Sequence, residues 1–168
     1  MAIRKIKTGD AACLYKVAKP VKDFDEKLWT LLEDMAETMY DADGCGLAGP
    51  QVGILRRVVV IDCSENRDEL IEAVNPEIIY TEGEQGGMEG CLSFPDEQGY
   101  VIRPNVAVMR AYDRRGNQFE LRGEGLLARA MLHECDHLDG NLYVDLVEGP
   151  LQDVDDVRED KDPDDKEG

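Results

Sequence analysis

The two histidines of this 168-residue chain lie four residues apart, in the segment MLHECDHLDG. Apolar residues recur with helical spacing from Gly125 to Gly140, and a glycine at 140 is well placed to end a helix. On a helix, His133 and His137 share one face, so both imidazoles can reach one divalent ion. Glu134 projects differently and is placed to act on a water beside such an ion. The alternative is the polar edge of an ordinary helix.

A catalytic metal site built on these histidines needs a third protein ligand. The extended pattern HECDHLDGNLY nearly matches H-E-x-x-H-x-x-G-x-x-H, but Tyr143 stands where a third histidine would be. A glutamate on a later helix has no good candidate, because Glu148 is followed only by an acidic segment. Cys91 is a better candidate, since a thiolate and two imidazoles suit iron or zinc and leave a fourth position open. Spacing alone does not select Cys91 over Cys45.

Composition limits the classes of function. The formal net charge of −18 argues against binding to phosphate backbones as the main activity, so we expect no direct contact with nucleic acid. No stretch approaches the roughly 18 apolar residues that a membrane span needs. The N-terminus lacks the apolar core of a signal peptide. The five cysteines form an odd, widely spaced set, which favours reduced thiols over disulfides.

The order of predicted elements indicates the fold class. A long amphipathic helix with Gly44 as its stop is followed by short β-branched runs, a hairpin, and the late helix that carries the histidines. We predict a helix at 23–44, strands at 56–63 and within 70–80 around a kink at Asn75-Pro76, a loop at 81–90, and a hairpin formed by VAVMRAYD and QFELRGEG. Helices and strands do not alternate, so we expect an α+β domain whose mainly antiparallel sheets pack around the late helix.

The last part of the chain differs in composition. Beyond residue 147 there are few apolar residues and acids outnumber bases. We therefore predict one compact catalytic domain over residues 1–147 and an acidic, disordered tail over 148–168. The simplest interpretation of the tail is an extension that aids solubility.

Three segments together resemble one family. GCGLAGPQ at 44–51, EGCLS at 89–93 and HECDH at 133–137 are similar, in order and separation, to the motifs G-φ-G-L-A-A-P-Q, E-G-C-L-S and H-E-x-D-H of peptide deformylases. The resemblance covers roughly residues 3–147. It implies an enzyme that removes the formyl group from the N-terminal formylmethionine of newly made proteins and releases formate.

The resemblance also implies the metal and its ligands. Cys91, His133 and His137 would hold one divalent ion, with Fe²⁺ expected in the cell and Zn²⁺, Ni²⁺ or Co²⁺ able to replace it. Glu134 would take a proton from the attacking water and pass it to the leaving amine. By the same resemblance, the Gln51 side chain and the backbone N–H of Leu92 would stabilise the oxyanion.

Other residues would shape and support the site. Gly46 would pair with the substrate peptide as a strand does. Residues that share a helix face with His133 would line the methionine pocket together with Cys45, the arginine through its aliphatic stem; these are Leu126, Arg129 and Ala130. The resemblance implies a supporting pair of Glu89 and Arg103, and we expect Asp136 to orient a ligand or the neighbouring backbone.

This chain departs from the family pattern at two positions of the first motif. Gly49 replaces the commoner alanine and Cys45 a branched aliphatic residue, which would loosen the loop of Gln51 and widen the pocket without removing a catalytic atom. The acidic C-terminus makes docking on the ribosome through a basic helix doubtful. We expect N-formylmethionyl nascent peptides as partners and a bacterial cytoplasm as the location.

Three rival classes remain from the sequence. A metalloprotease of another family lacks a third histidine or glutamate ligand. A non-catalytic binding protein would be expected to lose Glu134 or Gln51, and both are present. A hydrolase that uses Cys91 as a nucleophile would keep its activity without metal.

Overall fold

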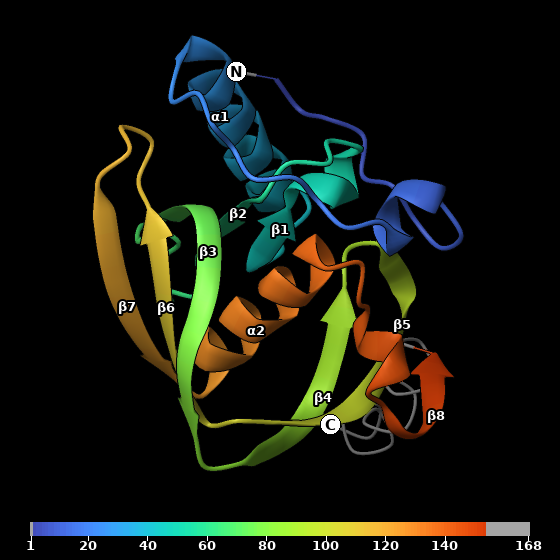
Figure 1. Ribbon diagram of the computed structural model, residues 1–168. Coiled ribbons are helices and arrows are strands. Elements are labelled where there is room, and N and C mark those ends of the chain that lie inside the picture. Colours follow the sequence, from blue (N-terminus) through green and yellow to red (C-terminus); the bar gives the residue numbers. More distant parts are fainter. Residues whose placement is uncertain (1, 154–168) are drawn as a thin grey trace.

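The computed structural model describes residues 2–153. These residues contain two α-helices and eight strands, and the strands form two antiparallel sheets (Figure 1). In chain order the elements are η1 (Ala12–Tyr15), α1 (Glu26–Asp41), β1 (Gly46–Ala48), η2 (Gly49–Val52), β2 (Val58–Ile61), β3 (Ile71–Glu82), β4 (Gln85–Cys91), β5 (Phe94–Arg103), β6 (Val106–Tyr112), β7 (Gln118–Glu124), α2 (Leu126–Leu138), η3 (Tyr143–Asp145) and β8 (Glu148–Asp153). The predicted α+β class with antiparallel sheets is confirmed.

The late helix α2 lies between the two sheets (Figure 1). One sheet has the strand order β1-β2-β3-β6-β7 and the other the order β4-β5-β8. The apolar side of α2, which includes Met131 and Leu138, packs in the core against Val59 and Met109 of the five-stranded sheet. Its polar residues instead reach strand β4 of the smaller sheet. The helix therefore presents its ionisable side chains to the space between the sheets.

Local signals set the limits of both helices. The side chain of Asp25 accepts a hydrogen bond from the N–H of Leu28, 3.2 Å away, so α1 begins at Glu26, three residues later than the predicted start. The α1 helix ends at Asp41, and Asp43 has a positive φ of 56°. The α2 helix ends at Leu138, just before Gly140 at a φ of 76°, in the left-handed conformation expected of a terminating glycine.

The predicted loop at 81–90 is wrong over most of its length. Residues 85–91 form strand β4, which pairs along its length with β5, for example Met88 with Tyr100. The many glycines of this segment had indicated a loop. The partner β5 begins after a two-residue turn, so β4 is held by hairpin pairing that its glycine-rich composition did not indicate.

The segment around Asn75-Pro76 is one strand with an irregularity. Strand β3 runs from Ile71 to Glu82, with a register shift between Val74 and Glu77, and Asn75 has a φ of 51°. The side chain of Asn75 also accepts from the N–H of Val21 and donates to its carbonyl oxygen, at 2.8 and 3.0 Å. The predicted kink is thus a β-bulge within a continuous strand.

The prediction of a disordered tail from residue 148 is wrong for its first six residues. Glu148–Asp153 form β8, which pairs with β5, for example Gln152 with Gln98. All six residues are exposed, so no alternation of buried and exposed positions marked this strand in the sequence. The rest of the predicted tail, residues 154–168, lies outside the described residues. Within residues 2–153, neither helix has the length and apolar character needed to cross a membrane.

Candidate metal centre

Three candidate ligands meet at the C-terminal end of β4. Cys91 is the last residue of β4, and His133 and His137 project from α2. The Nε2 atoms of the two histidines are 3.2 Å apart, and Nε2 of His137 is 3.3 Å from Sγ of Cys91. All three ligand atoms lie within 4.8 Å of one another, and among residues 2–153 no other cysteine, including Cys45, joins such a group. One thiolate and two imidazoles are a donor set that fits iron or zinc with one position left open.

The carboxylate of Glu89 orients His133. Oε2 of Glu89 lies 2.6 Å from Nδ1 of His133, which leaves the Nε2 atom to face Cys91 and His137. Arg103 donates to the same carboxylate through Nε and Nη2, at 3.0 and 2.7 Å, and through Nη1 to Asp136 at 2.9 Å. A carboxylate behind an imidazole is a common way of fixing a metal ligand. The predicted group of Glu89, Arg103 and Asp136 thus forms one network.

His137 is held in the form that a ligand requires. Burial lowers the pKa of His137 well below its ordinary value, because the charged imidazolium would lose its hydration. The imidazole is therefore neutral at physiological pH. A neutral imidazole can bind a metal ion, and Nε2 of His137 faces Sγ of Cys91 and Nε2 of His133.

Glu134 lies in the same space and is almost completely buried, with 4% of its surface exposed. Burial is the main cause that raises the pKa of this carboxyl to about 7. Its Oε1 atom is buried without a hydrogen-bond partner among the described residues. A carboxyl with these properties can both accept and return a proton near neutral pH.

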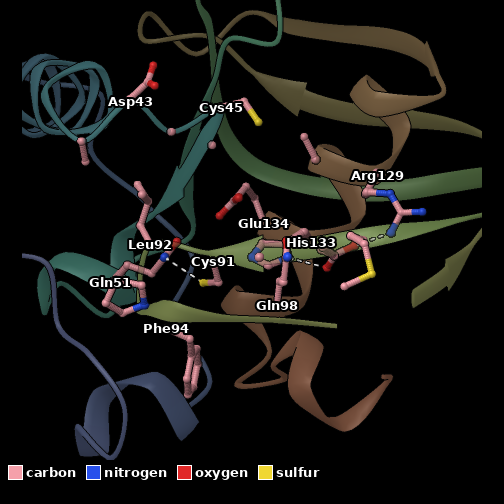
Figure 2. Close-up of a pocket in the computed structure, with 18 of the residues that line it drawn as sticks. Asp43, Cys45, Gln51, Cys91, Leu92, Phe94, Gln98, Arg129, His133 and Glu134 are labelled. Atoms are coloured by element: carbon pink, nitrogen blue, oxygen red, sulfur yellow. Dashed lines mark hydrogen bonds and ion pairs between the residues drawn. The ribbon is translucent and has the colours of Figure 1, made fainter. Parts of the chain in front are cut away.

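Gln51 brings an amide donor next to the candidate ligands. Its Oε1 accepts from the N–H of Ala48 at 2.9 Å, and this contact turns Nε2 toward Ser93 Oγ at 3.1 Å and Cys91 Sγ at 3.5 Å. Gln51, Cys91, His133 and Glu134 point toward one another in Figure 2. Leu92 lies in the turn between β4 and β5, on the wall of the same pocket. Ser93, not singled out from the sequence, is completely buried and holds the Gln51 amide; its place in EGCLS was the available signal.

A cavity of about 500 Å³ is lined in part by Gln51, Cys91, Leu92, His133 and Glu134. All five predicted substrate-binding residues line it: Cys45, Gly46, Leu126, Arg129 and Ala130. Leu126 is at the rim and 55% exposed, whereas Ala130 is buried. The sequence did not indicate that Asp43, Met88, Phe94 and Gln98 also belong to the wall (Figure 2).

Arg129 does more than the sequence indicated. Its Nη1 donates to Oε1 of Glu89 at 2.8 Å, and its Nη2 to the carbonyl oxygen of Val101 at 3.1 Å. The prediction assigned this residue to the pocket wall through its aliphatic stem alone. An ion pair between a helix and a distant strand leaves no pattern in the sequence.

Known proteins match the chain over nearly all of its described length. The family model described as polypeptide deformylase matches residues 3–152. The chain belongs to this family. A peptide deformylase of Lachnoclostridium phytofermentans is 53% identical over 154 residues, which cover 92% of this chain and 94% of that protein. The chain is therefore a hydrolase of the peptide deformylase family.

Solved deformylase structures share the fold. A peptide deformylase from Legionella pneumophila superposes with a TM-score of 0.85 at 49% identity, covering 88% of this chain and 87% of that one. Another from Thermotoga maritima gives 0.84 at 38% identity, covering 89% and 100%. Similarity over this length includes both sheets and the helix that separates them.

Proposed function

We propose that this deformylase removes the N-formyl group from the N-terminal formylmethionine of newly made proteins and releases formate. The observation that carries the proposal is the meeting of Cys91, His133 and His137 beside the buried Glu134, next to a cavity of about 500 Å³ that Cys91, His133 and Glu134 line. The family supports the reaction, and the donor set supports a single divalent ion as its cofactor.

The metal would be held by Sγ of Cys91 and by Nε2 of His133 and His137. A divalent ion at this position supplies Lewis acidity, which lowers the pKa of a water and polarises the formyl oxygen. We propose Fe²⁺ in the cell, with Zn²⁺, Ni²⁺ and Co²⁺ as possible replacements. A thiolate ligand beside a redox-active ion makes the iron form the more sensitive to oxygen.

Glu134 would act first as the general base and then as the general acid. Its carboxylate accepts a proton from the water that attacks the formyl carbon and then delivers it to the leaving amine. Nε2 of Gln51 and the backbone N–H of Leu92 would donate to the oxyanion that develops on the formyl oxygen. One such donor lowers the activation free energy by about 3 kcal/mol, and a neutral amide does so without repelling the developing charge.

The rest of the cavity would bind the substrate. The backbone at Gly46, in strand β1, would pair with the extended peptide as an added strand. The methionine side chain would lie against Cys45, which immediately precedes β1, and against three residues in the first turns of α2: Leu126, Arg129 and Ala130. Asp136 would support the site through Arg103 rather than by contact with a ligand.

The wider setting is also a proposal. The partners would be N-formylmethionyl nascent peptides, and the relatives named above are bacterial, which supports a bacterial cytoplasm. The net charge of −18 disfavours attachment to the ribosome through charge attraction to RNA.

The test is formate release from formyl-Met-Ala-Ser by protein loaded anaerobically with Fe²⁺ or Ni²⁺. We expect fast release by the wild type, loss of release after chelation, and a fall of about 10²–10⁴-fold in Glu134→Ala. Cleavage of unformylated Met-Ala-Ser would instead indicate a metalloprotease. Full activity after complete removal of the metal would indicate a hydrolase that uses the Cys91 thiol.

A further inference from the structure

The carboxylate of Glu89 receives four polar contacts in a buried space. Oε1 accepts from Nε of Arg103 and Nη1 of Arg129, at 3.0 and 2.8 Å. Oε2 accepts from Nη2 of Arg103 at 2.7 Å and faces Nδ1 of His133 at 2.6 Å. Each oxygen therefore has two partners, which fixes the plane and position of the carboxylate.

Arg129 brings a second guanidinium to this cluster. Arg103 is shared between Glu89 and Asp136, so one guanidinium serves two carboxylates. Arg129, with 7% of its surface exposed, supplies the second positive charge. The buried Glu89 carboxylate thus has Arg129 beside it in addition to the shared Arg103, and a buried charge is stable only with such partners.

Arg129 also ties three elements together around His133. It lies on α2 one turn before His133 and contacts Glu89 on β4 and the carbonyl of Val101 on β5. The guanidinium thus fixes the distance between the helix that carries two candidate ligands and the strand that ends at Cys91. Arg129 therefore links α2 to both β4 and β5 next to the candidate ligands.

We propose that Arg129 is a positioning residue for the metal centre, in addition to lining the pocket. By holding the Glu89 carboxylate, it keeps Nδ1 of His133 engaged and Nε2 of His133 aimed at Cys91 and His137. The inference rests on the proposed metal site. It predicts that loss of the guanidinium weakens metal binding even when no substrate is present.

The test compares Arg129→Met, Arg129→Lys and a control, Arg114→Met. Methionine keeps most of the stem's volume and removes every donor; lysine keeps the charge but cannot contact both Glu89 and Val101 as the planar guanidinium does. Arg114 is the matched control because it also forms a two-bond ion pair, at 2.9 and 2.7 Å to Glu72, away from the cavity. The dissociation constant for Co²⁺ is measured by competition with a chromophoric chelator, together with the Co²⁺ absorption spectrum.

For Arg129→Met we expect a 10- to 100-fold higher dissociation constant and an altered spectrum, with partial recovery in Arg129→Lys and no change in Arg114→Met. Wild-type affinity and an unchanged spectrum in folded Arg129→Met would overturn the proposal. If Arg129→Met does not fold, Arg129→Lys decides: weaker binding supports the proposal, and unchanged binding and spectrum contradict it. Tight Co²⁺ binding by a wild type that releases no formate would instead refute the proposed function and leave the role of Arg129 standing.

Discussion

A β-carbon placed on Gly46 would lie 2.5 Å from Oε2 of Glu134 and 2.9 Å from its Cδ and Cγ atoms. The backbone of β1 and the carboxyl on α2 are therefore in direct contact, and no side chain fits between them. From the sequence, this glycine was expected only to let a substrate strand approach. The structure adds a second reason, because Gly46 leaves the room that Glu134 occupies.

Gly46→Ala should therefore displace the proposed base. We expect the kcat for formate release to fall at least about 10²-fold, since a base moved out of reach loses most of its contribution. Metal affinity should stay within a few-fold of the wild type, because the three atoms nearest to the new methyl group all belong to Glu134 and none to a metal ligand. Steady-state kinetics and a Co²⁺ competition titration check the two halves of this prediction. Unchanged kcat would show that Glu134 does not act from its observed position.

Gln51 offers a test of the proposed oxyanion donor. Gln51→Glu keeps an oxygen for the N–H of Ala48 but replaces the donor Nε2 with an acceptor. We expect kcat to fall by about 10²–10³-fold with KM little changed, because the lost interaction strengthens only in the transition state. Ser93→Ala removes only a partner of Nε2 and should have a much smaller effect. Equal losses in the two variants would mean that the amide is structural.

Gly49 cannot accept the alanine that is common in the family motif. A β-carbon there would lie 2.6 Å from the carbonyl oxygen of Arg56 and 2.7 Å from that of Ile54. Backbone atoms cannot move away as a flexible side chain can, so Gly49→Ala should destabilise the fold by about 1–3 kcal/mol. The melting temperature should then fall by about 2–4 °C for each kcal/mol.

The matched control for this change is Gly90→Ala, with stability as the only measurement. A β-carbon at Gly90 would lie 3.6 Å from the carbonyl oxygen of Glu97, an ordinary contact distance. Thermal unfolding should show a clearly smaller loss for this variant. If Gly49→Ala is as stable as the wild type, the close packing of η2 against the segment before β2 is not maintained in solution. Such a result would instead agree with the expectation from the sequence that Gly49 loosens the loop that carries Gln51.

Local patterns predicted some elements and could not predict others. The spacing of apolar residues and Gly140 located α2, and the β-branched run located β2, because both signals depend only on neighbouring residues. Strand β4 is rich in glycine and β8 is fully exposed, so both depend on backbone pairing with β5. The partner of β4 follows it after a two-residue turn, whereas β8 is distant from β5 in the sequence, and in neither case does residue type alone encode the pairing.

The same division applies to the site. Helical spacing placed His133 and His137 on one face, but it did not distinguish Cys91 from Cys45 as their companion. The motif resemblance favoured Cys91, and the structure brings its Sγ to 3.3 Å from His137. The contact between Arg129 and Glu89 was missed, since it depends on how α2 lies against β4. The catalytic roles remain predictions that the variants above test.

Asp62 should make stability depend on pH. This fully buried carboxylate accepts hydrogen bonds from the hydroxyl of Tyr40 at 2.6 Å and from the N–H of Ser64 at 2.9 Å. Burial alone would raise the pKa of Asp62, but hydrogen bonds from Ser64, Tyr40 and Glu69 hold it below its ordinary value of 3.8. A lowered pKa stabilises the fold above that ordinary value, and the contribution is lost as the pH falls through the lowered pKa.

Asp62→Asn should therefore be less stable than the wild type at pH 7, by about 1–3 kcal/mol. The difference should shrink as the pH falls below about 4, because Asp62 of the unfolded wild type then takes up a proton while the folded carboxylate stays ionised until the pH reaches its lowered pKa. Urea unfolding at a series of pH values measures it, with the exposed Glu65→Gln as a control that should track the wild type. A difference that stays constant down to the acid transition would contradict this assignment.

The most direct test of the account is a titration of metal-depleted protein with Ni²⁺ while formate release from formyl-Met-Ala-Ser is followed. We expect no activity without metal, a linear rise as Ni²⁺ is added, and a plateau at about one ion per chain, as for one site with three protein ligands. Cys91→Ser should bind the ion more weakly and shift the rise to higher concentrations. Activity that is present before metal is added, or that does not depend on Cys91, would contradict a metal centre formed by Cys91, His133 and His137.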